Sequence, residues 1–264
     1  MRVAIVGGGA MGEAILSGAL DEGVLAAGDV VVAEVIASRR AHLEATYRVS
    51  TTAVASEAMA TADVVLLSVK PQEAKSATGK LTSGAVLISI MAGVRIATLA
   101  ADFGHGRIIR VMPNTPAAVR AGMSVWTATE AVDDGQRAFA RALLGAIGRE
   151  LYVTEEKKLD MATAVNGSGP AYLFLVIEAM VEGAVAVGLP RVQAEEIVLQ
   201  TVYGSALYAR ESGRGAAELR AAVTSPAGTT AAGLLELERG AVRAHIIDAI
   251  GAAYRRSVEL GGPG

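Results

Sequence analysis

The chain has 264 residues, of which 52% are hydrophobic, 19% charged and 4% aromatic, with a formal net charge of -3. This composition is typical of a folded globular protein, excludes disordered and fibrous classes, and lacks the basic surface expected of a nucleic-acid-binding protein. Because cysteine is absent and the three histidines show no ligand spacing, disulfides, a cysteine nucleophile and a metal site are not expected.

Up to residue 153, short β-branched runs alternate with alanine-rich segments. The predicted strands cover residues 3–6, 30–33, 64–68, 86–90, 108–111, 123–127 and 150–153, and the predicted helices cover 11–22, 39–47 and 134–148. Such alternation is typical of βαβ units that build a parallel sheet covered on both faces. We therefore predict an α/β Rossmann-like domain over residues 1–153.

After residue 154 the alternation stops and the remaining pattern is helical. The predicted helices cover residues 155–165, 171–187, 191–210, 216–223, 229–239 and 241–260. This change predicts a second, all-α domain over residues 154–264. Its most apolar helix, 171–187, carries Glu178 and Glu182, so we expect a buried helix and no membrane span. No secretory leader pattern is found at Met1, which favours the cytoplasm.

A glycine fingerprint follows the first predicted strand directly and opens the first predicted helix. Gly7 permits a tight turn, Gly9 lets phosphates approach the backbone, and Gly12 lets the helix lie close to the sheet. Free backbone N–H groups at such a helix start, here including those of Ala10 and Met11, suit a pyrophosphate. The pattern predicts a dinucleotide-binding site.

The residues after the second strand give conflicting indications about the adenosine ribose. Glu34 ends that strand, where an acidic residue binds a 2′-hydroxyl and favours NAD. Ser38 and Arg39 follow closely, and an arginine there can grip a 2′-phosphate, which favours NADP. We expect NADPH as the cofactor, with Ser38 and Arg39 among its ligands, and leave NADH as the alternative.

The ends of three later strands supply further candidate ligands at the carboxyl edge of the sheet, where open α/β folds bind their ligands. For the cofactor these candidates are Val69, Lys70, Pro71, Ala92, Gly93 and Asn114. Asn114 can also orient a substrate, although an Asx turn that closes on its own backbone is an equally good interpretation. Two loops that precede long predicted helices offer N–H groups and hydroxyls for a small carboxylate, namely Ser168, Gly169, Ser225, Gly228, Thr229 and Thr230.

The order of these motifs resembles the pyrroline-5-carboxylate reductase family, the last enzymes of proline biosynthesis. The motifs are G-x-G-A-M-G at 7–12, S-V-K-P at 68–71, I-M-A-G-V at 90–94, M-P-N-T-P at 112–116, G-S-G-P-A-Y at 167–172 and S-P-A-G-T-T at 225–230. The resemblance covers residues 1 to about 260. One departure is Ala227, which stands where the family usually has glycine, and alanine disfavours positive φ.

The resemblance implies a cytoplasmic enzyme that transfers hydride from NAD(P)H to the imine carbon of 1-pyrroline-5-carboxylate and forms L-proline. It implies a homodimer built through the C-terminal helices, with a pentamer of dimers as a larger assembly. The substrate carboxylate would lie on backbone amides of the loop 225–230, and Thr230 would be the catalytic hydroxyl near the ring nitrogen. A strong acid is not obligatory because a protonated imine is already electrophilic.

Three alternatives stay open from the residues. A related two-domain hydroxyacid dehydrogenase would need a lysine in the helical domain, and the candidates Lys157 and Lys158 lie in a charged run typical of a solvated helix start. An imine reductase acting on a six-membered homologue differs by one methylene, which is worth only about 1–3 kcal/mol of discrimination. A non-catalytic nucleotide-sensing protein would be expected to have lost the hydroxyl loops.

Overall fold

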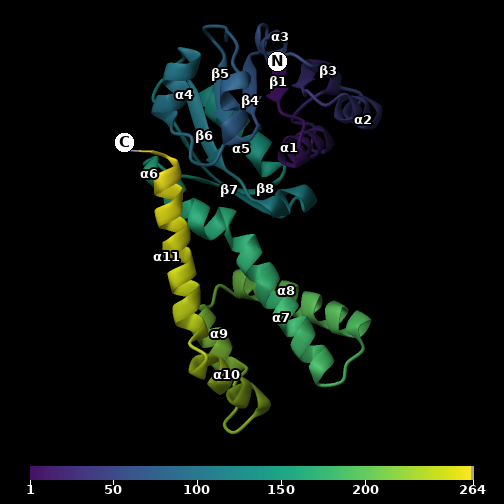
Figure 1. Cartoon of the computed structure of the whole chain (residues 1–264), viewed down its shortest axis with the longest axis vertical. Helices are drawn as coiled ribbons and strands as arrows, with labels where there is room; N and C mark the ends of the chain where they lie inside the picture. Colours follow the sequence, from purple (N-terminus) through teal and green to yellow (C-terminus); the bar gives the residue numbers. More distant parts are fainter. Residues whose placement is uncertain (263–264) are drawn as a thin grey trace. The chain divides into compact units, whose positions relative to one another are not determined.

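A computed structural model, which describes residues 1–262, contains one eight-stranded sheet in the order β3-β2-β1-β4-β5-β6-β7-β8 (Figure 1). The strands are β1 (Val3–Val6), β2 (Val30–Ala33), β3 (Ser50–Thr52), β4 (Val64–Leu67), β5 (Val86–Ser89), β6 (Ile108–Met112), β7 (Gly122–Ala128) and β8 (Gly148–Tyr152). Neighbouring strands are parallel except for the pair β6 and β7. The predicted α/β class and all seven predicted strands are confirmed, with ends shifted by a few residues.

Two features of the sheet differ from the sequence prediction. The strand β7 runs antiparallel to β6, because the connection between Met112 and Gly122 holds only a short 3-10 turn and no crossover helix. The edge strand β3 was not predicted, since Ser50–Thr52 is short and polar and resembles a loop.

Helices cover both faces of the sheet, as the parallel pattern requires. Side chains of β1 alternate between two apolar clusters, Val3 and Ile5 in one and Ala4 and Val6 in the other. The first cluster includes residues of α1 (Ala10–Asp21), α2 (Ala37–Tyr47) and α5 (Asp134–Gly145), and the second includes residues of α3 (Ala55–Met59) and α4 (Ile96–Phe103). The helices α3 and α4 were not predicted.

The rest of the chain is helical, as expected. Its helices are α6 (Lys157–Ala162), a π-helical turn (Thr163–Gly167), α7 (Gly169–Ala186), α8 (Arg191–Ser212), α9 (Ala216–Ala222), α10 (Thr229–Arg239) and α11 (Val242–Leu260). The chain forms two compact units: one holds Met1–Ser168 together with the residues from Ala252 onward, and the other holds Gly169–Gly251. The last two residues of the predicted helical domain, 263 and 264, lie outside the described residues.

A buried charge cluster links distant segments of the first unit. Arg110 on β6 is only 3% exposed, and its Nη1 lies 2.8 Å from Oε1 of Glu156 while its Nη2 lies 3.5 Å from Oδ1 of Asp160. The same Glu156 oxygen accepts the Ile96 N–H that opens α4 (2.8 Å), and the Ser257 hydroxyl of α11 donates to Asp160 (3.1 Å). Four segments distant in sequence are thereby tied together.

The prediction that helix 171–187 is buried is wrong for the single chain. In the described chain Val181 is the one buried residue of α7, whereas Phe174 is 60% and Leu175 66% exposed. The continuous helical run Lys157–Ala186 is long and apolar enough, by length and composition alone, to cross a membrane, and 6% of its most apolar window is buried. The presence of Glu178 and Glu182 in α7 therefore does not indicate a helix that is buried within the single chain.

Candidate active site

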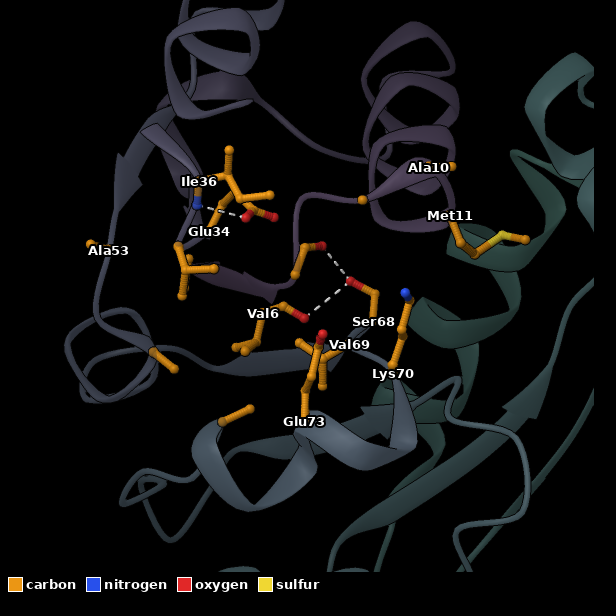
Figure 2. Close-up of a pocket in the computed structure, with 16 residues that line it drawn as sticks. Val6, Ala10, Met11, Glu34, Ile36, Ala53, Ser68, Val69, Lys70 and Glu73 are labelled. Atoms are coloured by element: carbon orange, nitrogen blue, oxygen red, sulfur yellow. Dashed lines mark hydrogen bonds between the residues drawn. The ribbon is translucent and has the colours of Figure 1, made fainter. Parts of the chain in front are cut away.

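A cavity of about 590 Å³ lies at the carboxyl ends of β1, β2 and β4. Figure 2 shows its lining, in which the glycine loop lies between the segment after β2 and the segment after β4. The lining residues are Val6, Gly7, Gly9, Ala10, Met11, Ala33, Glu34, Val35, Ile36, Ala53, Ala55, Ser68, Val69, Lys70, Glu73 and Ala77. Six predicted cofactor ligands are among them: Gly7, Gly9, Ala10, Met11, Val69 and Lys70.

The glycine loop has the shape that a pyrophosphate needs. Gly7 has φ of +102°, and a Cβ there would lie 2.8 Å from the carbonyl oxygen of Ser68. A Cβ on Gly12 would lie 2.2 Å from the Gly7 carbonyl oxygen, so glycine is needed where α1 meets the loop. A Cβ on Gly9 would meet no atom within 4 Å and would project from the loop that lines the cavity. The residues present therefore fit a dinucleotide.

Ser68 fixes the loop from the neighbouring strand end. Its hydroxyl lies 3.1 Å from the Val6 carbonyl oxygen and 2.6 Å from that of Gly7, as the dashed lines in Figure 2 show. Ser68 was not among the predicted site residues, although it opens the S-V-K-P motif. Ser68 lies next to Gly7 because β1 pairs with β4, and this pairing cannot be read from the local sequence.

Glu34 lies on the other side of the loop, at the end of β2. One carboxylate oxygen accepts the Gly8 N–H (2.9 Å) and the other accepts the Ile36 N–H (2.9 Å). The side chain is half-buried and held by two backbone donors. It therefore presents a fixed carboxylate to the cavity.

Arg39 does not line the cavity. Its Nη2 lies 2.6 Å from Oε2 of Glu13, and its Nε donates to the Gly8 carbonyl oxygen (3.2 Å). Burial raises the pKa of Glu13, but hydrogen bonds from Arg39, His42 and Tyr47 outweigh it and hold this pKa below its ordinary value. Arg39 thus supports the glycine loop through the Gly8 carbonyl oxygen without lining the cavity. Its contact with a 2′-phosphate stays a prediction.

The other predicted cofactor residues do not line the cavity either. Ser38 is exposed in the first turn of α2, and Pro71 opens a 3-10 turn (Pro71–Ser76). Ala92 is exposed beside Gly93, which has φ of +76°, and a Cβ there would lie 3.2 Å from Cβ of Leu260. These residues therefore surround the strand ends without forming part of this cavity.

Asn114 closes the turn between β6 and β7. Its Oδ1 accepts the Met123 N–H on β7 (2.8 Å), so the side chain does bind backbone, but it does not form the local Asx turn that was the alternative interpretation. Sequence reasoning missed Asn166, whose amide donates to the carbonyl oxygens of Met112 (2.9 Å) and Met123 (3.0 Å). Asn166 thereby holds the π-helical turn that precedes Ser168 against both strands.

The predicted substrate residues belong to both units. Asn114 and Ser168 lie in the first, and Gly169, Ser225, Gly228, Thr229 and Thr230 lie in the second. Gly228 is the N-cap of α10, and Thr229 and Thr230 are its first two residues. The N–H groups of this first turn have no partners within the helix and can bind a carboxylate. Ala227, just before the cap, has φ of +58°.

Lys157 and Lys158, the residues that a hydroxyacid dehydrogenase would require, are both paired with Glu155. Their Nζ atoms lie 2.6 Å and 3.0 Å from its carboxylate oxygens, and both side chains are exposed. The hydrogen bond to Glu155 raises the pKa of Lys157, which disfavours proton transfer from this lysine near neutral pH.

Two family models match separate parts of the chain. Residues 156–260 match pyrroline-5-carboxylate reductase dimerisation, and residues 2–93 match NADP oxidoreductase, coenzyme F420-dependent. A pyrroline-5-carboxylate reductase from Synechocystis is 43% identical over 264 residues, covering 99% of this chain and 98% of the relative. One from Arabidopsis thaliana is 40% identical over 98% of this chain and 95% of the relative. This chain belongs to the pyrroline-5-carboxylate reductase family.

Solved structures agree with this assignment. The pyrroline-5-carboxylate reductase of Coxiella burnetii superposes with a TM-score of 0.89 at 34% identity and covers 99% of both chains. That of Plasmodium falciparum, solved with NADP bound, gives 0.89 at 27% identity over 99% of this chain and 98% of the other. The predicted family, fold class and NAD(P)H-dependent oxidoreductase class are confirmed, and the predicted NADP cofactor agrees with these relatives. The match to the dimerisation model also explains the exposed apolar surface of α7.

Proposed function

We propose that this chain reduces 1-pyrroline-5-carboxylate to L-proline with NADPH as cofactor and NADH as an alternative. The observation that carries this proposal is the glycine loop at the end of β1, whose shape suits a dinucleotide, in a chain 43% identical to a pyrroline-5-carboxylate reductase over nearly its whole length. The relatives are pyrroline-5-carboxylate reductases by name, and the six motifs in order support the same substrate for this chain.

The N-terminal domain, residues 1–153, holds the cofactor. Backbone N–H groups of Gly9, Ala10 and Met11 at the start of α1 bind the pyrophosphate, because the positive helix end favours an anion. Lys70 lines the same cavity and supplies a cation for a phosphate or ribose oxygen. The reduced nicotinamide, when bound, supplies the hydride that the imine carbon of the substrate accepts, and this carbon becomes C5 of proline.

The C-terminal domain, residues 154–264, binds the imine acid. The first-turn N–H groups of α10 receive its carboxylate, assisted by Ser225, Gly228 and Thr229. The Thr230 hydroxyl hydrogen-bonds the ring nitrogen and orients the imine. A threonine hydroxyl is too weak an acid to donate a proton unaided, so Thr230 acts by orientation or by relaying a proton from water.

The functional molecule is a homodimer formed through the C-terminal helices, and a pentamer of dimers is the larger assembly. The match of residues 156–260 to the dimerisation model and the exposed apolar side chains of α7 support a dimer. The cytoplasm is the compartment in which this biosynthetic reaction takes place.

A direct assay tests the proposal. Purified protein is mixed with 1-pyrroline-5-carboxylate and either NADPH or NADH, the loss of reduced-nicotinamide absorbance is followed, and the product is identified as L-proline by chromatography. A parallel assay uses the six-membered imine homologue. Turnover of the five-membered imine to proline is the expected result. If both cofactors bind but neither supports turnover of this imine, the proposed substrate is wrong.

A further inference from the structure

The side-chain amide of Asn166 joins two strands of the sheet. Asn166 lies in the π-helical turn Thr163–Gly167, and its Nδ2 donates to the carbonyl oxygens of Met112 (2.9 Å) and Met123 (3.0 Å). Met112 ends β6 and Met123 is the second residue of β7. An amide nitrogen carries two protons, so these two bonds engage both of them. The nitrogen of Asn166 therefore binds backbone and is not available to a ligand.

This bridge lies where the hydrogen-bonded ladder between β6 and β7 has ended. The antiparallel register stops at the pair Met112 and Val125 and does not include Met123. Asn166 thus supplies a link between the strands beyond their last pair. Met123 is also held through its N–H, which donates to Oδ1 of Asn114 (2.8 Å). Side-chain amides therefore bind both backbone polar groups of Met123.

The turn that Asn166 anchors also fixes the backbone of Ser168. Ser168 follows the turn directly, and its N–H donates to the Thr163 carbonyl oxygen (2.9 Å), which closes the turn. A Cβ on Gly167 would collide with Cε of Met112, so glycine allows the turn to lie against the end of β6. The position of Ser168 relative to β6 therefore depends on Asn166.

Two polar groups near this anchor are available to a ligand. Within the described residues 1–262, the hydrogen bonds involve neither Nδ2 of Asn114 nor the hydroxyl of Ser168. Both residues are half-buried. An amide N–H and a hydroxyl are donors that the carboxylate of an imine acid accepts. Asn166 connects the segments that carry these two donors.

We propose that Asn166 is a positioning residue for the imine acid, because its two hydrogen bonds keep Asn114 and Ser168 at the separation at which both bind the substrate. This role rests on the proposed function, in which Asn114 and Ser168 are substrate ligands. A displacement of about 1 Å in such groups costs on the order of a hundredfold in rate. Asn166 acts through the backbone and does not touch the substrate.

The variant Asn166→Asp tests this role. It keeps the shape of the side chain but replaces the two donors with carboxylate oxygens, which repel the carbonyl oxygens of Met112 and Met123. At about pH 8, kcat/KM for 1-pyrroline-5-carboxylate is expected to fall roughly hundredfold. Kd for NADPH, measured by fluorescence titration, should change less than about twofold, because none of these three residues lines the cofactor cavity. An unchanged Kd also shows that the variant is folded.

The pH profile separates the effect of the hydrogen bonds from that of packing. Two carbonyl oxygens favour a protonated carboxyl group, so the pKa of the new side chain in Asn166→Asp should be raised. As the pH falls from about 8 to about 5.5, this group becomes a donor, and kcat/KM relative to wild type should rise. Asn166→Ala has no titrating group, so its relative kcat/KM should stay roughly tenfold below wild type at every pH.

Gln136→Glu is the matched control, because it makes the same change from amide to carboxylate at a similar contact. Gln136 of α5 is exposed, and its Nε2 donates to the Gly84 carbonyl oxygen (2.9 Å) of a distant segment. This variant should retain the kcat/KM of wild type at each pH. An equal loss in Gln136→Glu would overturn the role of Asn166, because any such change would then impair the enzyme.

Two further results would overturn the role of Asn166 alone. Wild-type kcat/KM in Asn166→Asp and Asn166→Ala, with only a lower free energy of unfolding, would make the residue merely structural. A relative kcat/KM of Asn166→Asp that is constant across the pH range would show that a restored donor does not restore the site. If the wild-type protein does not reduce the imine, the proposed reaction is wrong and the role of Asn166 is lost with it.

Discussion

Thr230 occupies the second position of α10, two residues after the N-cap Gly228. At this position the backbone N–H lacks a helical partner while the side-chain hydroxyl lies at the positive end of the helix. One residue can thus offer an N–H to a carboxylate and a hydroxyl to a ring nitrogen. The neighbouring Thr229 gives the same turn a further N–H donor, whereas the Gly228 N–H already donates to the Ser225 carbonyl oxygen (3.1 Å).

Replacing Thr230 with alanine tests the role of the hydroxyl alone. The variant Thr230→Ala is expected to lower kcat roughly hundredfold, with Kd for NADPH unchanged because the cofactor residues lie in the N-terminal domain. Thr230→Ser, which keeps the hydroxyl, should retain most of the activity. Unchanged kinetics in Thr230→Ala would remove this residue from the active site.

Ala227 adopts a backbone conformation that disfavours alanine. Its φ of +58° lies in the left-handed region, where an L-residue pays roughly 1–2 kcal/mol. The variant Ala227→Gly is expected to raise the free energy of unfolding by about 0.5–1 kcal/mol, because the relief of strain at positive φ exceeds the entropy that glycine gains in the unfolded chain. Urea unfolding measures the difference, and a loss of stability would show that Ala227 is not strained. Ala184→Gly, within α7, is the opposite control and should destabilise.

At this scale the sequence predicts residues whose role is local. Gly7, Gly9 and Gly12 were predictable because their chemistry depends only on the turn that they form. The contacts of Arg39 and Glu34 were not, because each pairs with a group that another segment brings near: Glu13 from α1 and the Gly8 N–H from the glycine loop. A single sequence does not tell which of two nearby charged residues faces a ligand.

At the scale of elements, the buried cluster around Arg110 joins β6, the start of α4, α6 and the end of α11. A buried pair of this kind has a large desolvation cost, so its net contribution to stability is small while both partners remain. Its main effect is to specify which segments meet. The cost appears when one partner is removed.

Removing Arg110 alone leaves Glu156 and Asp160 without their cation. The variant Arg110→Ala is expected to lower the free energy of unfolding by roughly 3–5 kcal/mol, measured by urea denaturation. The matched control is Arg107→Ala, just before β6, whose partner Asp133 is 57% exposed at 3.0 Å. That exposed pair should contribute about 1 kcal/mol or less. Equal losses in the two variants would contradict the role given to burial.

Strong periodicity explains which elements were predictable. The buried strands β1, β2, β4, β5 and β6 are mainly apolar runs rich in β-branched residues, whereas β3 is short and polar. The N-cap residue of α4, Arg95, makes no capping hydrogen bond with its side chain, and the Glu156 carboxylate from a distant segment accepts the first N–H of the helix instead. Such a start leaves no local sequence signal.

At the scale of the whole molecule, the exposed apolar side chains of α7 are the main departure from a self-contained monomer. These side chains are Leu173, Phe174, Leu175, Val176 and Met180, each at least 40% exposed. Exposed apolar area of this extent marks an interaction surface. The sequence pattern predicted a buried helix because it does not distinguish burial within a chain from burial against a second copy.

A charge placed on this surface is expected to disrupt the dimer. The variant Leu175→Glu, at a residue 66% exposed in the single chain, should sediment as a monomer or dissociate at a higher protein concentration than wild type. Val119→Glu, at a residue 76% exposed in the first unit, is the control and should leave the sedimentation coefficient unchanged. A Leu175→Glu protein that remains fully dimeric would place the interface elsewhere.

The first compact unit is made of two stretches of chain, Met1–Ser168 and the residues from Ala252 onward. During synthesis the sheet can form early, but Asp160 receives its hydrogen bond from Ser257 only after the whole second unit has been translated. The last piece of the first unit therefore leaves the ribosome after the whole second unit. A fragment ending at Ser168 would keep all the strands of the sheet yet leave Asp160 without its Ser257 donor, so the buried cluster around Arg110 is complete only when the segment that contains Ser257 is present.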